Sequence, residues 1–65
     1  MRDTFSKRWD DNHGFTYQEA LQKKANVEEA YGVGSPNSKW EEAKIVPDPK
    51  KKDGYMVTID TKKES

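Results

Sequence analysis

The chain has 65 residues, of which 37% are charged and 31% are apolar, and its twelve basic and twelve acidic residues leave no net charge. A chain of this length makes one small domain, which buries only roughly 60% of the surface of its unfolded state. The chain has no cysteine, which excludes disulfide bonds and thiolate zinc sites, and its zero net charge argues against strong non-specific binding to nucleic acid.

Residues 1–14 are predicted to form either a mobile arm or a short helix. Phe5 and Trp9 lie four positions apart and would share one face of such a helix. Asp10 and Asp11 would place negative charge in its last turn, where the helix dipole disfavours it. Both alternatives stay open, and in the mobile-arm alternative Trp9 pins the arm to the rest of the chain.

Residues 17–31 carry the clearest helix signal. Thr16 and Glu19 form a capping box directly before it, and a glycine directly after it is a helix stop. Lys24 and Glu28 are four positions apart and are expected to pair with each other. The apolar positions fall within roughly a 160° arc of a helical wheel, and they are Tyr17, Ala20, Leu21, Ala25, Val27 and Tyr31.

Two strands are predicted in the C-terminal half, over about 43–47 and 55–60. The first ends at a proline, which favours an extended exit, and a second capping box favours a helical turn over 39–43 before it. The second strand alternates apolar and polar residues and follows Asp53-Gly54, a strong turn dipeptide. We expect the two strands to pair as an antiparallel hairpin with a lysine-rich tip.

The predicted fold class is therefore α+β, with the amphipathic helix packed on a C-terminal antiparallel hairpin. The hairpin needs the helix, because an isolated hairpin is barely stable in water. A single α+β domain is expected over residues 15–61, preceded by the arm or short helix of residues 1–14 and followed by a disordered tail over 62–65.

Catalysis and metal binding have little support in the sequence. His13 is the one histidine and follows Asp10-Asp11-Asn12, but the pattern matches no loop with defined ligand positions. No serine lies in a nucleophile-elbow motif, and there is no cysteine nucleophile. We expect a solvated turn at His13, no metal, no cofactor and no enzymatic activity.

The stretch from Trp40 to Val57 resembles the wing region of small phage excisionases. The residues that carry the resemblance are Trp40, Lys44-Ile45-Val46-Pro47-Asp48-Pro49, Lys52, Gly54 and Tyr55. The resemblance implies a winged-helix protein that bends DNA together with an integrase, with Trp40 on the recognition helix. The sequence departs from that family at Glu41 and Glu42, where members carry arginines and where carboxylates would repel phosphates.

We expect a small accessory protein that acts by binding another protein, as a regulator or inhibitor of the kind that phages and mobile elements carry. A tryptophan in so small a chain is usually in the core, but aromatic residues left outside it would be the anchors of an interface. The candidate anchors are Trp9, Tyr31 and Tyr55.

The alternative function is DNA binding through basic residues, chiefly at the hairpin tip. The candidates are Lys44, Lys50, Lys51 and Lys52, with Lys7 and Arg8 as a second basic spot. The tip lysines could equally be solvated charges that deter strand aggregation. A monomer and a homodimer are both compatible with so small a core.

The chain is predicted to be cytoplasmic, inside the host cell if a phage encodes it, and to have no membrane partner. No stretch approaches the roughly 20 apolar residues that a membrane-spanning helix needs. The first five residues lack the apolar region of a signal peptide.

Overall fold

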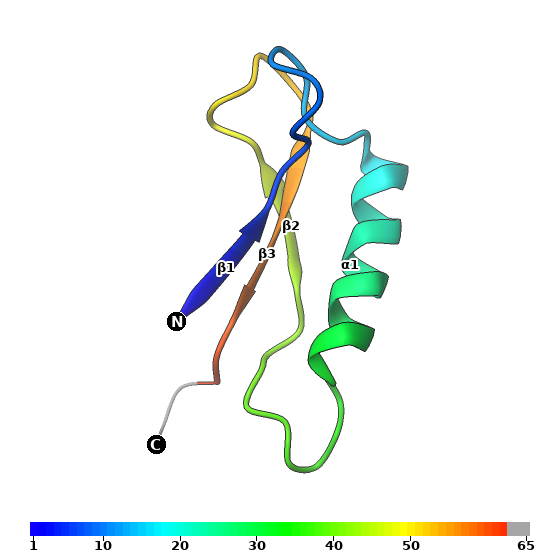
Figure 1. Cartoon of the computed structure of the whole chain (residues 1–65), viewed down its shortest axis with the longest axis vertical. Coiled ribbons are helices and arrows are strands. Elements are labelled where there is room, and N and C mark those ends of the chain that lie inside the picture. The colour runs from blue at the N-terminus through cyan, green and yellow to red at the C-terminus, as the bar shows by residue number, and fades with distance from the viewer. Residues whose placement is uncertain (63–65) are drawn as a thin grey trace.

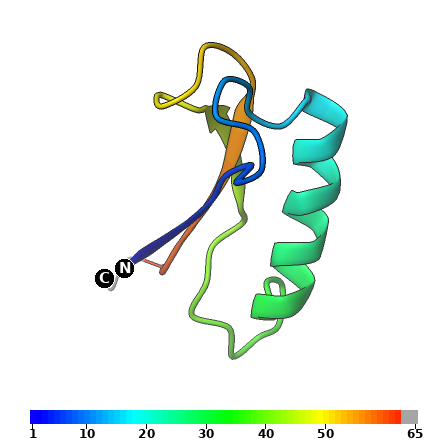
Figure 2. The same cartoon turned by 45° about the horizontal axis from the view of Figure 1, so that its top comes forward.

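The computed structural model describes residues 1–62, which form one α-helix and a three-stranded antiparallel sheet. The elements follow in the order β1 (Arg2–Phe5), α1 (Tyr17–Tyr31), β2 (Lys44–Pro47) and β3 (Tyr55–Asp60). The C-terminal strand β3 lies in the centre of the sheet, between β1 and β2. The helix lies along one face of the sheet (Figure 1 and Figure 2). The α+β class is confirmed, and most of the predicted tail lies outside the described residues.

The helix begins and ends where the sequence predicts. Thr16 Oγ1 accepts a hydrogen bond from the Glu19 N–H at 3.2 Å, and Glu19 Oε1 accepts one from the Thr16 N–H at 3.0 Å. Gly32 follows the last turn in the left-handed conformation, and its N–H donates to the carbonyls of Glu28 and Glu29. Both ends of α1 are therefore capped by the chain itself.

The predicted apolar arc of α1 is only partly the face that packs on the sheet. Ala20 and Val27 are buried, whereas Leu21 is 44% exposed and Tyr17 is 56% exposed. Half-buried Lys24 lies on the packed side of the helix, between the two buried positions. The buried face is thus rotated away from Leu21 and toward a charged residue.

A β-bulge lies directly before β2. The chain advances four residues from Trp40 to Lys44, while its partner strand moves only three, from Thr61 to Thr58. One residue is therefore extra, and the ladder is interrupted there. The predicted helical turn over 39–43 is wrong, because this backbone is extended alongside the end of β3.

Glu28 satisfies the backbone that the bulge leaves without a strand partner. The buried Ala43 donates its N–H to Glu28 Oε2 at 3.2 Å, while Glu28 Oε1 accepts from Lys24 Nζ at 3.2 Å. Lys24 Nζ also lies 2.9 Å from Glu42 Oε1. The expected Lys24–Glu28 pair is confirmed. It does not face solvent alone, because it also joins α1 to Glu42 and Ala43, directly before β2.

The N-terminal segment forms a strand, so the predicted short helix is wrong, and the expected hairpin is part of a larger sheet. β1 pairs antiparallel with β3 from Arg2 opposite Asp60 to Phe5 opposite Val57. The Phe5 ring packs edge-on against Tyr31 with centroids 6.1 Å apart. The spacing of Phe5 and Trp9 fits a helix, but pairing with β3 packs the half-buried Phe5 against the core.

The core lies between α1 and the sheet. The tryptophan at position 40 is half-buried and packs edge-on against Tyr31, with centroids 4.7 Å apart. The opposite face of the sheet carries the alternate residues of the strands, and no element within residues 1–62 covers it (Figure 2). The buried apolar residues are Phe15, Ala20, Val27, Ala43, Val57 and Ile59.

The backbones of Gly14 and Gly54 cross in close contact where β3 begins. The Gly14 N–H donates to the Asp53 carbonyl at 2.8 Å, and Phe15 and Tyr55 exchange two backbone hydrogen bonds of 2.9 Å each. A β carbon on Gly54 would lie 2.6 Å from the Gly14 backbone, and one on Gly14 would lie 2.8 Å from the Tyr55 carbonyl oxygen. Only glycine fits at either position.

Alanine at Gly54 should destabilise the protein more than alanine at Gly34. Both glycines have nearly the same φ, 92° and 91°, so both substitutions carry about 1 kcal/mol of backbone strain. A β carbon on Gly34 meets nothing within 4 Å, whereas the clash at Gly54 adds about 1–3 kcal/mol. Urea unfolding of Gly54→Ala and Gly34→Ala measures the difference, and equal losses would show that the crossing is looser than described.

Candidate functional site

An apolar groove opens beside Trp9, in the segment that connects β1 to the glycine crossing. We call this segment, residues 6–13, the Trp9 loop. Trp9 is 74% exposed and therefore lies outside the core, although a tryptophan in so small a chain is usually buried there. The groove encloses about 290 Å³ and is lined by Phe5, Ser6, Arg8, Trp9, Phe15 and Lys23.

The aromatic floor of the groove is continuous with the core. The Trp9 ring meets Phe15 edge-on with centroids 6.1 Å apart and planes at 69°, and Phe15 is itself buried. Phe5 lies beside them at the end of β1 and packs on the core cluster. Trp9 is thus supported by the core along one edge while most of its surface faces solvent.

Three cations surround these rings. Lys7 Nζ lies 5.8 Å from the centroid of the Trp9 ring, and Lys23 Nζ lies 5.2 Å from that of Phe5, both within the range of cation–π attraction. Arg8 lines the groove as well. Glu19 offsets one of these charges, because its Oε1 lies 3.6 Å from Lys7 Nζ. The site therefore combines an apolar floor with a cationic rim.

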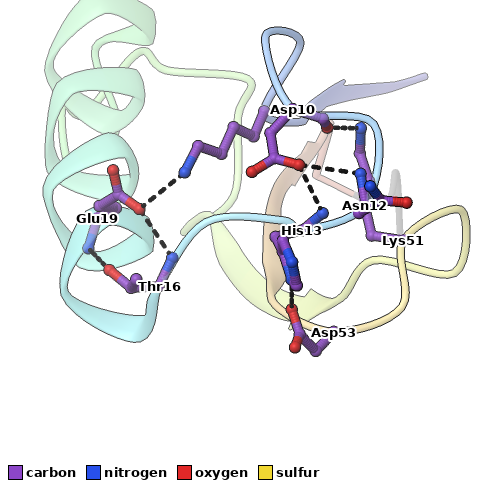
Figure 3. A network of polar contacts seen from close by, with 8 residues as sticks. Asp10, Asn12, His13, Thr16, Glu19, Lys51 and Asp53 are labelled. Carbon is purple, nitrogen blue, oxygen red and sulfur yellow. Dashed lines mark hydrogen bonds and ion pairs between the residues drawn. The ribbon is translucent and has the colours of Figure 1, made fainter.

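Polar contacts hold the Trp9 loop against α1 and the hairpin tip (Figure 3). Asp10 Oδ1 accepts hydrogen bonds from the N–H groups of Asn12 at 2.9 Å and His13 at 3.0 Å, and these bonds lower the pKa of Asp10. Lys51 Nζ donates to the Asp10 carbonyl. His13 Nδ1 lies 2.6 Å from Asp53 Oδ1. Together with the Lys7–Glu19 pair, these contacts tie the Trp9 loop to α1 and to the hairpin tip.

The other two predicted anchors lie elsewhere and are half-buried. The Tyr31 hydroxyl donates to Asp3 Oδ2 at 2.6 Å, and this bond raises the pKa of Tyr31. The Tyr55 ring packs edge-on against Tyr17 with centroids 5.7 Å apart. Neither Tyr31 nor Tyr55 lines the groove, so Trp9 alone among the three predicted anchors presents most of its side chain to solvent.

The lysines of the DNA-binding alternative do not form one surface. Lys44 begins β2, whereas the other three lie beyond its opposite end, in the tip. Lys50 and Lys52 are exposed, but Lys51 is half-buried and bonded to the Asp10 carbonyl. The tip also contains Asp48 and Asp53, so its charge is mixed.

The sequence pointed to Trp9 but not to the groove around it. The sequence alone does not place Arg8 and Lys23 in one site. They line the same groove only because the fold brings the Trp9 loop against α1. The one local signal was the tripeptide Lys7-Arg8-Trp9, where an aromatic residue directly follows two basic ones.

No family model, no curated protein and no solved structure matches this chain. Within residues 1–62, no three histidine, cysteine, aspartate or glutamate side chains gather closely enough to hold a metal ion. The single helix of that part of the chain is too short and too polar to cross a membrane.

The His13–Asp53 pair predicts a pH-dependent stability. Asp53 raises the pKa of His13, chiefly by accepting its hydrogen bond. The stabilisation is therefore fully present below the pKa of histidine in the unfolded chain, about 6.5, and is lost as pH rises through the higher pKa of the folded state. Urea midpoints at about pH 5.5 and about pH 8.5 should thus fall with pH.

Two variants isolate this pair from the other groups that titrate. His13→Gln and Asp53→Asn each remove one partner, so both should show a smaller fall in midpoint between the two pH values than the unmodified chain. If either variant retains the full pH dependence, another group is responsible.

Proposed function

We propose that this chain is a small accessory protein that acts by binding another protein, and that Trp9 anchors the interface. The observation that carries the proposal is the 74% exposure of Trp9 beside an apolar groove. Exposing most of a tryptophan side chain to water is unfavourable for an isolated protein. Tryptophan is also among the residues most enriched at the energetic centres of interfaces. Binding would let the protein act as a regulator or inhibitor, by covering or recruiting a surface of its partner.

The groove supports tight binding because its walls are already ordered. Trp9 is held by the Phe15 edge and by Lys7, and its loop is tied at Asp10 and His13. A partner would therefore lose little affinity to the ordering of this surface.

The charge around the groove defines the chemistry of the partner. Arg8 and Lys23 line the groove, and Lys7 lies over the Trp9 ring and pairs with the carboxylate of Glu19. The complementary ligand is a peptide segment that presents an apolar side chain to the floor and acidic side chains to the rim. We infer an acidic segment of a partner protein as the occupant.

Nucleic acid is the alternative that the same experiment addresses. A single strand could stack a base on Trp9 and place phosphates near the rim. The peptide is favoured because Lys7 already lies over the Trp9 ring, and because Lys44 is separated from the tip lysines by the length of β2. One of the tip lysines, Lys51, is also bonded to the Asp10 carbonyl.

A peptide array tests the proposal. Its peptides carry a central leucine or phenylalanine flanked by glutamate, lysine or serine, and single-stranded oligonucleotides are spotted beside them. The chain should bind the glutamate-flanked peptides best. Trp9→Ala should weaken this binding at least about tenfold, as expected of an interface anchor, whereas Leu21→Ala removes an exposed apolar residue outside the groove and should have little effect.

A charge-matched pair tests the role of the rim. Lys23→Glu and Lys39→Glu change the net charge equally, but only Lys23 lines the groove. Lys23→Glu should reverse the preference for glutamate-flanked peptides, and Lys39→Glu should preserve it. Equal effects, or binding to oligonucleotides alone, would refute the proposal. The fluorescence of half-buried Trp40 reports whether Trp9→Ala remains folded.

A further inference from the structure

The outer edge of β1 presents backbone groups that the sheet does not use. The Thr61 N–H donates to the Met1 carbonyl at 3.0 Å, which makes these two residues a hydrogen-bonded pair. Bonded and non-bonded pairs alternate along an antiparallel ladder. In the β1–β3 register, Arg2 and Thr4 therefore turn their N–H and C=O groups away from β3.

The far side of β3 supports the same alternation. Asp60 lies opposite Arg2, and its carbonyl accepts the Glu41 N–H at 2.8 Å from the β2 side. Arg2 and Thr4 are both exposed, and β1 lies at the outer side of the sheet (Figure 1). Within residues 1–62, no hydrogen bond involves the outward backbone groups of these two residues. β1 thus offers two donors and two acceptors at alternate residues, the arrangement that an added strand requires.

The outer edge of β2 is less open. The Asp48 N–H donates to the Gly54 carbonyl at 3.2 Å, so the alternation in β2 leaves Ile45 and Pro47 facing outward. Proline has no N–H to donate, and the N–H of Ala43 is already bonded to a glutamate carboxylate of α1. One outward donor remains on β2, and proline at a sheet edge discourages pairing. β1 is therefore the edge that can accept a further strand.

The open edge of β1 leads directly into the Trp9 groove. Phe5 is the last residue of β1, Ser6 is the next, and both line the groove. A residue opposite Phe5 in an added strand lies on the same side of the sheet as the Phe5 ring. That is the side of α1, where Lys23 Nζ lies 5.2 Å from the ring centroid. An apolar side chain at this position of the added strand enters the groove.

The charges beside the edge favour an acidic segment. The side chain of Arg2 is 66% exposed, and its Nε bonds to Asp60 Oδ1 at 2.8 Å. Within residues 1–62, no group accepts a hydrogen bond from the terminal nitrogens of this guanidinium. The one carboxylate of β1, that of Asp3, accepts the Tyr31 hydroxyl at 2.6 Å. Arg2 thus extends the cationic rim of the groove along the edge.

We propose that the acidic partner segment adds to the outer edge of β1 as a fourth strand, and that this pairing directs its apolar side chain into the Trp9 groove. The inference rests on the proposed function and adds an extended conformation and backbone recognition of the ligand. A second copy of this chain is a poorer occupant. Its own edge carries Arg2, Lys7 and Arg8 against the one carboxylate of Asp3, so two such edges repel each other.

Hydrogen exchange followed by NMR tests the added strand. The probe is a blocked seven-residue peptide with a central leucine flanked by glutamates, added to saturation. The amides of Arg2 and Thr4 should exchange at least about tenfold more slowly in the complex, because hydrogen bonding protects amides. The amide of Ile45, the outward donor on β2, is the internal control and should exchange at an unchanged rate.

Two N-methylated versions of this peptide test backbone recognition on the unmodified chain. One carries N-methyl groups at three alternate residues, and the other carries them at three of the remaining residues. Only one of these sets of N–H groups faces β1 in an extended strand. One version should therefore bind at least about tenfold more weakly, because it loses two hydrogen bonds, whereas the other should bind like the parent peptide.

A variant of β1 tests the same pairing from the other side. Thr4→Pro removes an outward N–H, and an edge strand tolerates proline where the N–H faces solvent. The variant should bind the peptide about threefold more weakly, within the range of one hydrogen bond. Thr4→Val keeps the N–H at nearly the same size and should bind as the unmodified chain does. Trp40 fluorescence reports whether Thr4→Pro remains folded.

The outcomes separate this inference from the proposed function. Peptide binding that depends on Trp9, with unprotected amides at Arg2 and Thr4 and equal affinities for both N-methylated peptides, would overturn the added strand and leave the proposed function intact. Absence of peptide binding would overturn both. Protection of the two amides in the free chain that rises with its concentration would assign the edge to a second copy and would also overturn the inference.

Discussion

The backbones of Gly14 and Gly54 pass so closely that neither residue has room for a β carbon. This crossing allows Phe15 to pair with Tyr55, which places the first residue of the core beside the start of β3. It also brings the Trp9 loop against the hairpin tip, where Lys51 contacts it. The Trp9 groove is lined by Phe15, which directly follows Gly14, so the arrangement of the groove depends on this contact.

The parts of the fold that local sequence determines were predictable. The capping box at Thr16 and Glu19 and the alternation along β3 are set by residues close together in the chain, and both gave the correct element. β1 was missed because its pairing is entirely non-local: Phe5 meets Val57. Within residues 1–14 alone, the spacing of Phe5 and Trp9 is equally typical of a helix.

The predicted buried face of α1 is partly wrong because charged residues lie on the side that packs against the sheet. Lys24 and Glu28 interrupt the apolar arc of α1, and a solvent-facing pair is the simplest interpretation of their spacing. The bulge at Ala43 gives Glu28 a backbone partner that spacing cannot reveal.

The central position of β3 has a consequence for how the chain assembles. β1 is synthesised first, but within residues 1–62 its only strand partner is β3, the last element. An unpaired strand invites association with other chains, and the short length and the charges of Arg2 and Asp3 limit this hazard. The Thr61 N–H donates to the Met1 carbonyl at 3.0 Å, so a circular permutant that connects these two residues by a short linker would turn the strand pairing of largest sequence separation into a local hairpin.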